Sequence, residues 1–256
     1  MLLALDAGNS NLTAALFDGQ RLEAVWRLRA DPRTTADDLS VTFAALLRAR
    51  GLSEANVTDV GIACVVPPLA PALAALAAQH LRAPAVVVGP EDAGGLRIAV
   101  DEPAALGPDR IAGAVAAVER HGAPVVVADF GSATTLTVVS SERAIVGGAI
   151  APGIGMAARA LHERTGRLPL VEPAAPGRAV GASTQEAIRA GVVFGCVGAV
   201  RELLRRTRAE LGSEAPMIAT GGLCGVIAPL LPEIAAVEPL LTLEGVRLAC
   251  ERGRPA

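Results

Sequence analysis

Two aspartates lie in Asp-x-Gly turns that each follow an apolar run. Asp6 belongs to LDAGNSN (5–11) and Asp129 belongs to ADFGSATT (128–135). Such a turn can be purely structural, since glycine adopts positive φ and Asp or Asn satisfies nearby backbone groups. It can also be chemical, because a phosphate chain with Mg²⁺ requires carboxylates on the metal side and backbone amides of small residues on the phosphate side. Two matching turns in one chain favour the chemical interpretation.

The polar residues of the two turns divide into metal and phosphate ligands. Asp6 would hold hydrated Mg²⁺, while the Asn-Ser-Asn run at 9–11 would contact phosphate oxygens. In the second turn, Asp129 and Ser132 would do the matching work. The chain contains no Lys, which excludes a P-loop lysine as the phosphate ligand.

The segment GPDR (107–110) opens an amphipathic helix and has two interpretations. Asp109 suits the first turn of a helix, where a carboxylate is stabilised by the helix dipole. Alternatively, Asp109 accepts a proton from a substrate hydroxyl and Arg110 binds an anionic group. The residues alone leave both interpretations open. In either case, an aspartate at a helix N-terminus is expected to have a low pKa and to be a weak base.

A strand, a Gly-Gly turn and a helix are predicted in MIATGGLCGVIAP (217–229). Paired glycines permit a flat ring such as adenine to approach the backbone, and they equally permit close packing of strand and helix. The segment GIGMAA (153–158) lacks the third glycine and the acidic partner of a dinucleotide-binding fingerprint, which argues against that site.

Alternating strand and helix patterns position these motifs and predict an α/β fold. In the first half we expect strands at 2–6, 12–18, 22–29, 59–66 and 85–89, and helices at about 35–50, 69–81 and 109–121. Strand, turn and strand then recur from residue 125, and Asp129 follows Asp6 by 123 residues, close to half the chain. Helices at about 153–164, 184–211 and 242–252, a short helix after Gly222 and a strand at 216–220 complete the second half. The chain is therefore predicted to be an internal duplication with a cleft between the two turns.

The composition of the chain argues against several classes of partner and metal site. The 256 residues are 52% hydrophobic and carry a formal net charge of −3, so neither nucleic acid nor an anionic membrane is an expected partner. The four cysteines are widely spaced and indicate reduced thiols rather than a metal site. The uncharged run from 60 to 81 is interrupted by prolines, and Met1 leads directly into a strand. We therefore expect a soluble, cytoplasmic protein.

Taken together, seven segments resemble the motifs of type III pantothenate kinases, in order and in spacing. They are DAGNSN, GPDR, DFGSATT, GGAIAPGIGMAARALHERTGRLP, GASTQEAI, ATGGL and LTLEGVRLACER. This family is part of the acetate kinase, sugar kinase, Hsp70 and actin superfamily. The resemblance implies two duplicated ribonuclease H-like (actin-like ATPase) domains around a central cleft, with boundaries at 1–117 for the domain with the phosphate loop and 118–256 for the domain with the second loop and the adenosine-side Gly-Gly turn.

The resemblance also implies an activity and its ligands. The implied activity is phosphorylation of the primary hydroxyl of (R)-pantothenate by ATP, the first step of coenzyme A synthesis. The implied cofactors are Mg²⁺ and a monovalent cation (K⁺ or NH₄⁺). The resemblance further implies a homodimer that binds pantothenate near its interface. The implied ATP-binding residues are Asp6, Ala7, Gly8, Asn9, Ser10, Asn11, Leu12, Thr13 and Ser132. The implied substrate-binding residues are Val100, Gly107, Pro108, Asp109, Arg110 and Thr184. Asp109 is the implied catalytic base, and Asp6 and Asp129 are the implied metal ligands.

Four positions depart from the family pattern. Pro108 stands where a small residue is more usual, and its fixed φ is compatible with the start of a helix. Val100 stands where members commonly carry a substrate-contacting Tyr, which concerns substrate affinity rather than phosphoryl transfer. Ser10 and Ser132 replace Thr and keep the hydroxyl. Two alternatives to a pantothenate kinase follow from the residues: a kinase of the same superfamily acting on another small hydroxy compound, and a nucleotide-binding accessory or regulatory protein without turnover.

Overall fold

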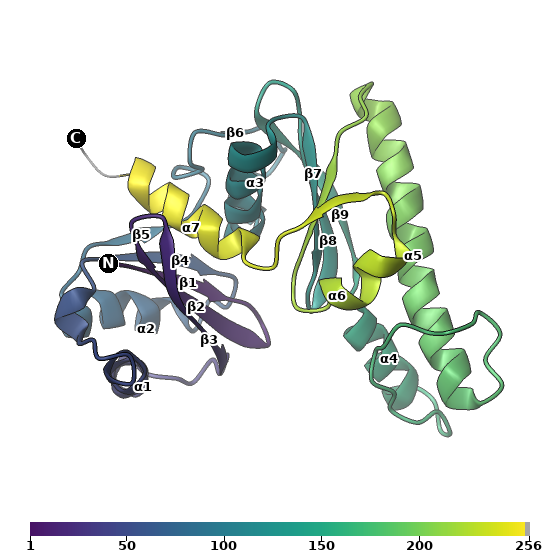
Figure 1. Cartoon of the computed structure of the whole chain (residues 1–256), viewed down its shortest axis with the longest axis horizontal. Helices are drawn as coiled ribbons and strands as arrows, with labels where there is room; N and C mark the ends of the chain where they lie inside the picture. The colour runs from purple at the N-terminus through teal and green to yellow at the C-terminus, as the bar shows by residue number, and fades with distance from the viewer. Residues whose placement is uncertain (254–256) are drawn as a thin grey trace. The chain divides into compact units, whose positions relative to one another are not determined.

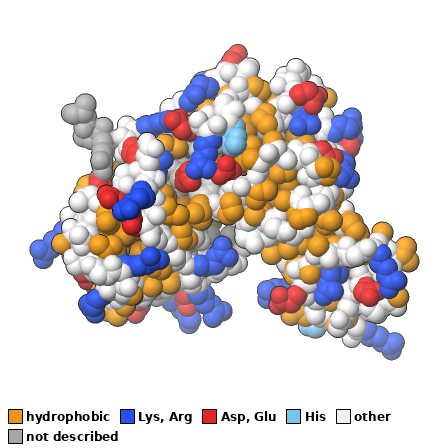
Figure 2. All heavy atoms as spheres, in the orientation of Figure 1, with side chains coloured by type: hydrophobic (Ala, Val, Ile, Leu, Met, Phe, Trp, Pro, Cys, Tyr) orange, Lys and Arg blue, Asp and Glu red, His pale blue; other side chains and the backbone are white. Residues whose placement is uncertain are grey.

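The computed structural model describes residues 1–253, which form two compact units. Unit 1 consists of Met1–Glu119 and the chain from Leu241 onward, and unit 2 consists of Arg120–Leu240. Each unit contains one β-sheet (Figure 1). Arg side chains and acidic side chains are interspersed on the face shown in Figure 2, as the small net charge leads one to expect.

The strands and helices follow the predicted order. The strands are β1 (Leu2–Ala7), β2 (Asn11–Asp18), β3 (Arg21–Arg29), β4 (Asp59–Cys64), β5 (Ala85–Val87), β6 (Arg97–Ile98), β7 (Val125–Phe130), β8 (Ala133–Val139), β9 (Ala144–Pro152), β10 (Met217–Thr220) and β11 (Ile234–Val237). The α-helices are α1 (Ala36–Arg48), α2 (Ala70–Ala75), α3 (Pro108–His121), α4 (Ile154–Glu163), α5 (Thr184–Leu211), α6 (Cys224–Ile227) and α7 (Leu241–Arg252). Single turns of other helix types lie at Glu54–Asn56, Leu76–Leu81, Pro103–Ala105 and Ala228–Leu230.

The sheet of unit 1 has the strand order β3-β2-β1-β4-β5. β1 pairs antiparallel with β2 and parallel with β4, so it is the central strand. Because successive side chains of a strand point to opposite faces, Leu3 and Leu5 pack with Phe43 and Leu73 of α1 and α2 on one face. α7 covers the other face, where its Arg247 guanidinium lies 5.6 Å from the ring centre of Phe17. Both faces of β1 are therefore buried.

Unit 2 repeats this arrangement with β7 in the place of β1. Its strands are ordered β11-β10-β7-β8-β9, with β7 antiparallel to β8 and parallel to β10. β1 and β7 each have six residues, and in both the fifth residue is the half-buried aspartate between buried neighbours. α5 and α6 pack on one face of this sheet through side chains such as Val193, Val197 and Ile227. The shared topology confirms the predicted duplication.

Three features differ from the expectations. The two-residue strand β6 was not predicted. β11 was not predicted, because it is a four-residue strand, alternately half-buried and exposed, between Pro232 and Pro239. The domain boundary expected after residue 117 assigned α7 to the second domain, whereas this helix packs on β1 and β4 of unit 1. Gly61 of β4 makes this packing possible, since a Cβ there would lie only 2.5 Å from Val246 Cγ1. No helix among residues 1–253 is long and apolar enough to cross a membrane.

Candidate active site

Asp6 lies one residue before the end of β1, at the point where the sheet of unit 1 turns into a loop. Its register partners are Thr13 on β2 and Ala63 on β4, so these three side chains point to the same face. The turn is closed by Gly8, whose N–H donates to the carbonyl oxygen of Asn11 at 2.9 Å. A half-buried carboxylate at the mouth of a glycine turn suits a hydrated divalent cation.

The residues after Asp6 divide into an exposed tip and a buried base. Asn9, Ser10 and Asn11 are exposed at the surface of the turn. Ala7 and Leu12 are completely buried, so their side chains hold the turn on the core and only their backbone is available to a ligand. The predicted ATP-binding residues therefore have two different roles in the structure.

Asp129 occupies the corresponding position in unit 2. Its register partners are Thr135 on β8 and Thr220 on β10, which places two hydroxyls and a carboxylate on one face. The N–H of Gly131 donates to the carbonyl oxygen of Ala133 at 3.0 Å and closes this second turn. The face therefore has three neighbouring oxygen-bearing side chains, whereas the equivalent face of unit 1 has Ala63 in place of one Thr.

The Gly-Gly turn packs directly against the second aspartate turn. Gly221 has a φ of +93°, and a Cβ there would overlap Asp129 Oδ1 and lie 2.7 Å from the backbone N of Phe130. The next turn of chain is fixed by Leu223, whose N–H donates to the carbonyl oxygen of Phe130 at 3.0 Å. Close packing of strand and helix thus accounts for Gly221. Asp129 also adds to the effect of burial in raising the pKa of the Cys224 thiol.

The GPDR segment forms the first turn of α3, with Pro108 as its first residue. The N–H groups of Arg110 and Ile111 both donate to the carbonyl oxygen of Gly107 at 3.1 Å. The carboxylate of Asp109 folds back, so that Oδ1 accepts from the N–H of Arg110 at 2.9 Å and a Cβ at Gly107 would overlap it. Glycine is therefore required at 107 for this orientation of the carboxylate.

The expected low pKa of Asp109 is wrong. Burial raises the pKa of this carboxyl above its ordinary value of 3.8 and outweighs the hydrogen bond from the Arg110 N–H and the Arg110 charge, which lower it. Burial likewise lowers the pKa of the Arg110 guanidinium, and the neighbouring Asp109 partly offsets this. Local charges at a helix N-terminus lower the pKa of an aspartate. The tertiary fold removes water around Asp109, and this burial raises its pKa by more.

Val65 connects the GPDR segment to the Asp6 turn within unit 1. Its N–H donates to the carbonyl oxygen of Ala7 at 3.0 Å, and its Cγ1 lies 3.8 Å from where a Cβ of Gly107 would be. The adjoining Cys64 is close enough to Asp6 for that carboxylate to contribute to its raised thiol pKa, after burial. Val65 thus lies between the segment that carries Asp109 and the turn that carries Asp6. Sequence reasoning missed Val65, because an apolar residue after a strand carries no chemical signal.

The remaining predicted residues lie at three separate places. Ser132 is exposed beside Gly131, and a Cβ at Gly153 would lie 2.6 Å from the carbonyl oxygen of Gly131, so α4 begins against this turn. Val100 is half-buried between β6 and the turn at Pro103–Ala105. Thr184 is exposed as the first residue of α5.

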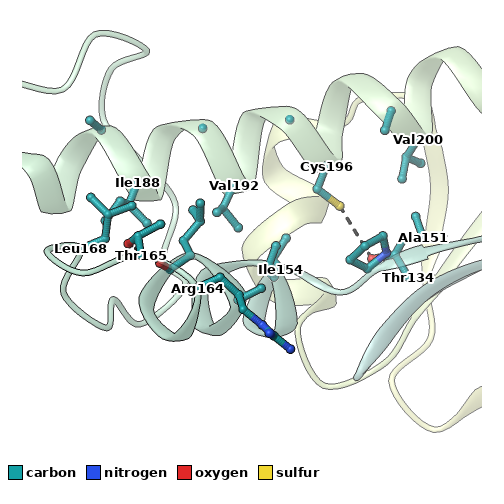
Figure 3. Close-up of a pocket in the computed structure, with 18 of the residues that line it drawn as sticks. Thr134, Ala151, Ile154, Arg164, Thr165, Leu168, Ile188, Val192, Cys196 and Val200 are labelled. Atoms are coloured by element: carbon teal, nitrogen blue, oxygen red, sulfur yellow. Dashed lines mark hydrogen bonds between the residues drawn. The ribbon is translucent and has the colours of Figure 1, made fainter.

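Thr184 also lines an apolar groove of about 820 Å³ in unit 2. One end contains Thr165, Leu168 and Ile188, and the other end contains Cys196 and Thr134 (Figure 3). Thr134 is buried and pairs in register with Phe130, so this end of the groove adjoins the second aspartate turn. The groove therefore connects two of the predicted ligand-binding positions in unit 2.

The donor atoms of both turns are oxygens, which suit Mg²⁺ and alkali cations rather than zinc or copper. Within the described part of the chain there is no group of three or more His, Cys, Asp and Glu residues that could hold a metal ion. A cation at either turn would therefore rely on hydroxyls, backbone carbonyls, water or a bound phosphate for its other ligands.

Comparison with protein families identifies relatives over nearly the whole chain. Residues 2–206 match the family model for type III pantothenate kinase. Type III pantothenate kinase of Thermomicrobium roseum is 47% identical over 253 residues, covering 98% of this chain and 97% of that protein. The protein of the same name from Moorella thermoacetica is 40% identical and covers 98% and 99%.

Solved structures resemble the fold at lower identity. A Baf family protein from Campylobacter jejuni has a TM-score of 0.62 at 21% identity and covers 97% of both chains. Component A of (R)-2-hydroxyglutaryl-CoA dehydratase from Acidaminococcus fermentans has a TM-score of 0.50 at 12% identity and covers 98% and 96%. Together with the equivalent order of the five strands around β1 and around β7, these structures confirm the predicted fold class of duplicated ribonuclease H-like domains.

We predict that the Asp109 carboxyl titrates above 3.8, the ordinary value for Asp, because burial disfavours its charged form. Replacing Arg110 by Met should raise the pKa further, since the Arg110 charge lowers it. Carboxyl ¹³C chemical shifts followed against pH would measure both values. A titration of Asp109 below 3.8 would contradict the dominance of burial.

Proposed function

The chain belongs to the type III pantothenate kinase family, and we propose that Asp109 is the base of the reaction and that the Asp6 turn binds the phosphates of ATP. The family gives the activity itself: ATP-dependent phosphorylation of pantothenate in coenzyme A synthesis, with a divalent metal ion. The observation that carries our assignment is the contact chain from Asp109 through Gly107 and Val65 to Ala7, the residue after Asp6.

In the proposed reaction the primary hydroxyl of pantothenate attacks the γ-phosphorus of ATP. The bond between that phosphorus and the β,γ-bridging oxygen breaks, ADP leaves, and the hydroxyl proton passes to the Asp109 carboxylate. A raised pKa makes Asp109 a stronger base than an ordinary aspartate, provided that the pH stays above this pKa. Mg²⁺ bound with ATP beside Asp6 would supply charge neutralisation at the phosphates.

The other predicted residues would position the two substrates. Asn9, Ser10 and Asn11 are exposed and would contact phosphate oxygens, and Ser132, which is also exposed, is proposed as a further ATP contact. Arg110 would bind the carboxylate of pantothenate through its planar guanidinium. These assignments rest on side-chain chemistry and on the family resemblance.

Gly107, Pro108, Val100 and Thr184 belong to the proposed pantothenate site. Gly107 gives the Asp109 carboxylate its orientation, and Pro108 fixes φ at the start of α3. Thr184 offers a hydroxyl at the edge of the apolar groove. Val100 would contact the substrate only through apolar atoms. The proposal includes a cytoplasmic location, where ATP is available.

We further assign Asp129 to the monovalent cation, K⁺ or NH₄⁺. The support is the row of oxygens formed by Thr135, Asp129 and Thr220 across three paired strands. Weakly hydrated monovalent cations accept hydroxyl and carboxylate oxygens without the strict octahedral geometry of Mg²⁺. The cation would offset part of the negative charge of ATP.

A second copy of this chain is proposed to cover the apolar groove. Exposed apolar side chains also occur on the elements that border the groove, with Ile150 on β9 69% exposed and Met156 on α4 51% exposed. Gly191 and Gly195 of α5 line the groove and would let a helix approach closely. Both features favour a hydrophobic homodimer interface.

We predict that Asp109→Asn lowers kcat by about 100-fold or more, a loss typical of a missing general base, with little change in the KM for ATP. A coupled assay of ADP release, with and without pantothenate and with potassium present, measures this. Asp101→Asn, the same change at an exposed aspartate, serves as the control. Near-normal turnover of Asp109→Asn would leave Asp109 as a helix-terminal residue without a role in proton transfer.

Replacement of Asp129 by Ala is expected to abolish activation by potassium, because Asp129 is the only charged side chain in the row of Thr135, Asp129 and Thr220. In this variant, neither kcat nor the melting temperature should change with potassium concentration. The dependence of kcat on Mg²⁺ should be retained. Thr58→Ala, a hydroxyl lost at the opposite end of the sheet of unit 1, serves as a control. Unchanged stimulation by potassium would place the cation site elsewhere.

For the homodimer we predict a mass near twice the 25.9 kDa of the chain by light scattering. Gly195→Glu should shift the protein towards the monomer, since it places a charge in the apolar groove. Val41→Glu, at a 72% exposed position on α1 of unit 1, should leave the mass unchanged. A monomeric wild-type protein would contradict this assignment.

A further inference from the structure

The last helix of the chain touches the helix that carries Asp109 backbone to backbone. A Cβ at Gly245 of α7 would overlap the carbonyl oxygen of Ala112 on α3 and would lie 2.9 Å from its Cα. These obstructing atoms are backbone atoms, which cannot move aside as the end of a flexible side chain can. Only glycine therefore permits α3 and α7 to lie at their observed separation.

A second contact joins the two helices. Arg252 of α7 pairs with Glu119 of α3 at 2.5 Å, and it also donates to the carbonyl oxygen of Gly94. The Arg252–Glu119 pair therefore adds a side-chain contact between the two helices to the backbone contact at Gly245 and Ala112.

The sheet of unit 1 prevents α7 from moving away from α3. A Cβ at Gly61 of β4 would lie 2.5 Å from Val246 Cγ1 and 2.6 Å from Cys250 Sγ, so the helix already rests on the strand backbone. The thiol of Cys250 also donates to the carbonyl oxygen of Val60 at 3.8 Å. With a closely packed sheet on one side, any atom added at Gly245 must displace α3 instead.

Displacement of α3 would move the carboxylate of Asp109. Ala112 is three residues after Asp109, less than one helical turn, and the N–H groups of Arg110 and Ile111 hold this turn to Gly107. A shift at Ala112 is thus transmitted to the start of the helix. We propose that Gly245 is a positioning residue for the reaction: its missing side chain sets the position of α3 and thereby of the Asp109 carboxylate.

This inference rests on the proposed role of Asp109, and Gly245→Ala tests it. We expect kcat to fall about tenfold or more with the KM for ATP nearly unchanged, because a misplacement of about 1 Å at a reacting group can cost up to about 100-fold. Cys250→Ala is the matched control on the same helix. It loosens the packing against β4 without touching α3, so kcat per folded enzyme should stay within about twofold.

The pH profile separates positioning from a general loss of stability. In the wild-type enzyme, kcat/KM for pantothenate should fall at low pH as Asp109 is protonated. This acid limb is assigned to Asp109 if it disappears in Asp109→Asn. In Gly245→Ala this limb should move to lower pH, because a displaced carboxyl is less buried and its pKa returns towards the ordinary value. Cys250→Ala should keep the wild-type limb. Fluorescence of Trp26, the single tryptophan, which contacts Phe43 in unit 1, reports that each variant is folded.

Each outcome decides the question. Suppose that Asp109→Asn loses its turnover and its acid limb. A Gly245→Ala variant that is folded and keeps the wild-type kcat and the wild-type acid limb would then overturn the positioning role. If Asp109→Asn keeps its turnover, the proposed base fails instead. Should Gly245→Ala not fold, Arg252→Gln replaces it, since it weakens the second contact and leaves Gly245 in place. Faster hydrogen exchange at the Arg110 and Ile111 amides with lower kcat would then support the proposal, and unchanged exchange would overturn it.

Discussion

Close contact between carboxylate oxygens and glycine backbone determines the geometry of both candidate turns. Asp109 Oδ1 occupies the space that a side chain at Gly107 would take, and Asp129 Oδ1 does the same at Gly221. A carboxylate packed in this way has few orientations, and for Asp109 burial also raises the pKa, so its direction and its basicity are set together. A side chain at either glycine would change the orientation of the carboxylate beside it, so only backbone can lie at these points.

Local sequence patterns predicted the long helices and the central strands well and the short edge strands poorly. α5 begins at Thr184 and ends at Leu211 as expected, because a Ser N-cap and a Gly with positive φ mark its ends in the sequence. β11 was missed, since four residues between two prolines carry no periodicity. The duplication was visible because both copies retain a strand of six residues with the aspartate at the fifth position.

Of the candidate site, the residue types were predictable and their environments were not. The motif GPDR identified Asp109 and Arg110, yet the local argument from the helix dipole gave the wrong sign for the pKa of Asp109. Burial of this carboxyl depends on tertiary packing, which no local sequence pattern around residue 109 reveals. Val65 and Gly245 were missed for the same reason: an apolar residue and a glycine reveal their roles only through what lies beside them.

The two repeats share a scaffold but differ in the side chains beside the aspartate. Asp6 has Ala63 as its partner on the parallel strand, whereas Asp129 has Thr220 at the same place. A cation at Asp6 would find fewer protein oxygens and would keep more of its water, which suits strongly hydrated Mg²⁺. A cation at Asp129 could exchange water for two hydroxyls and a carboxylate, which suits a weakly hydrated monovalent ion. One difference between equivalent strands thus supports the proposed division between the divalent and the monovalent cation.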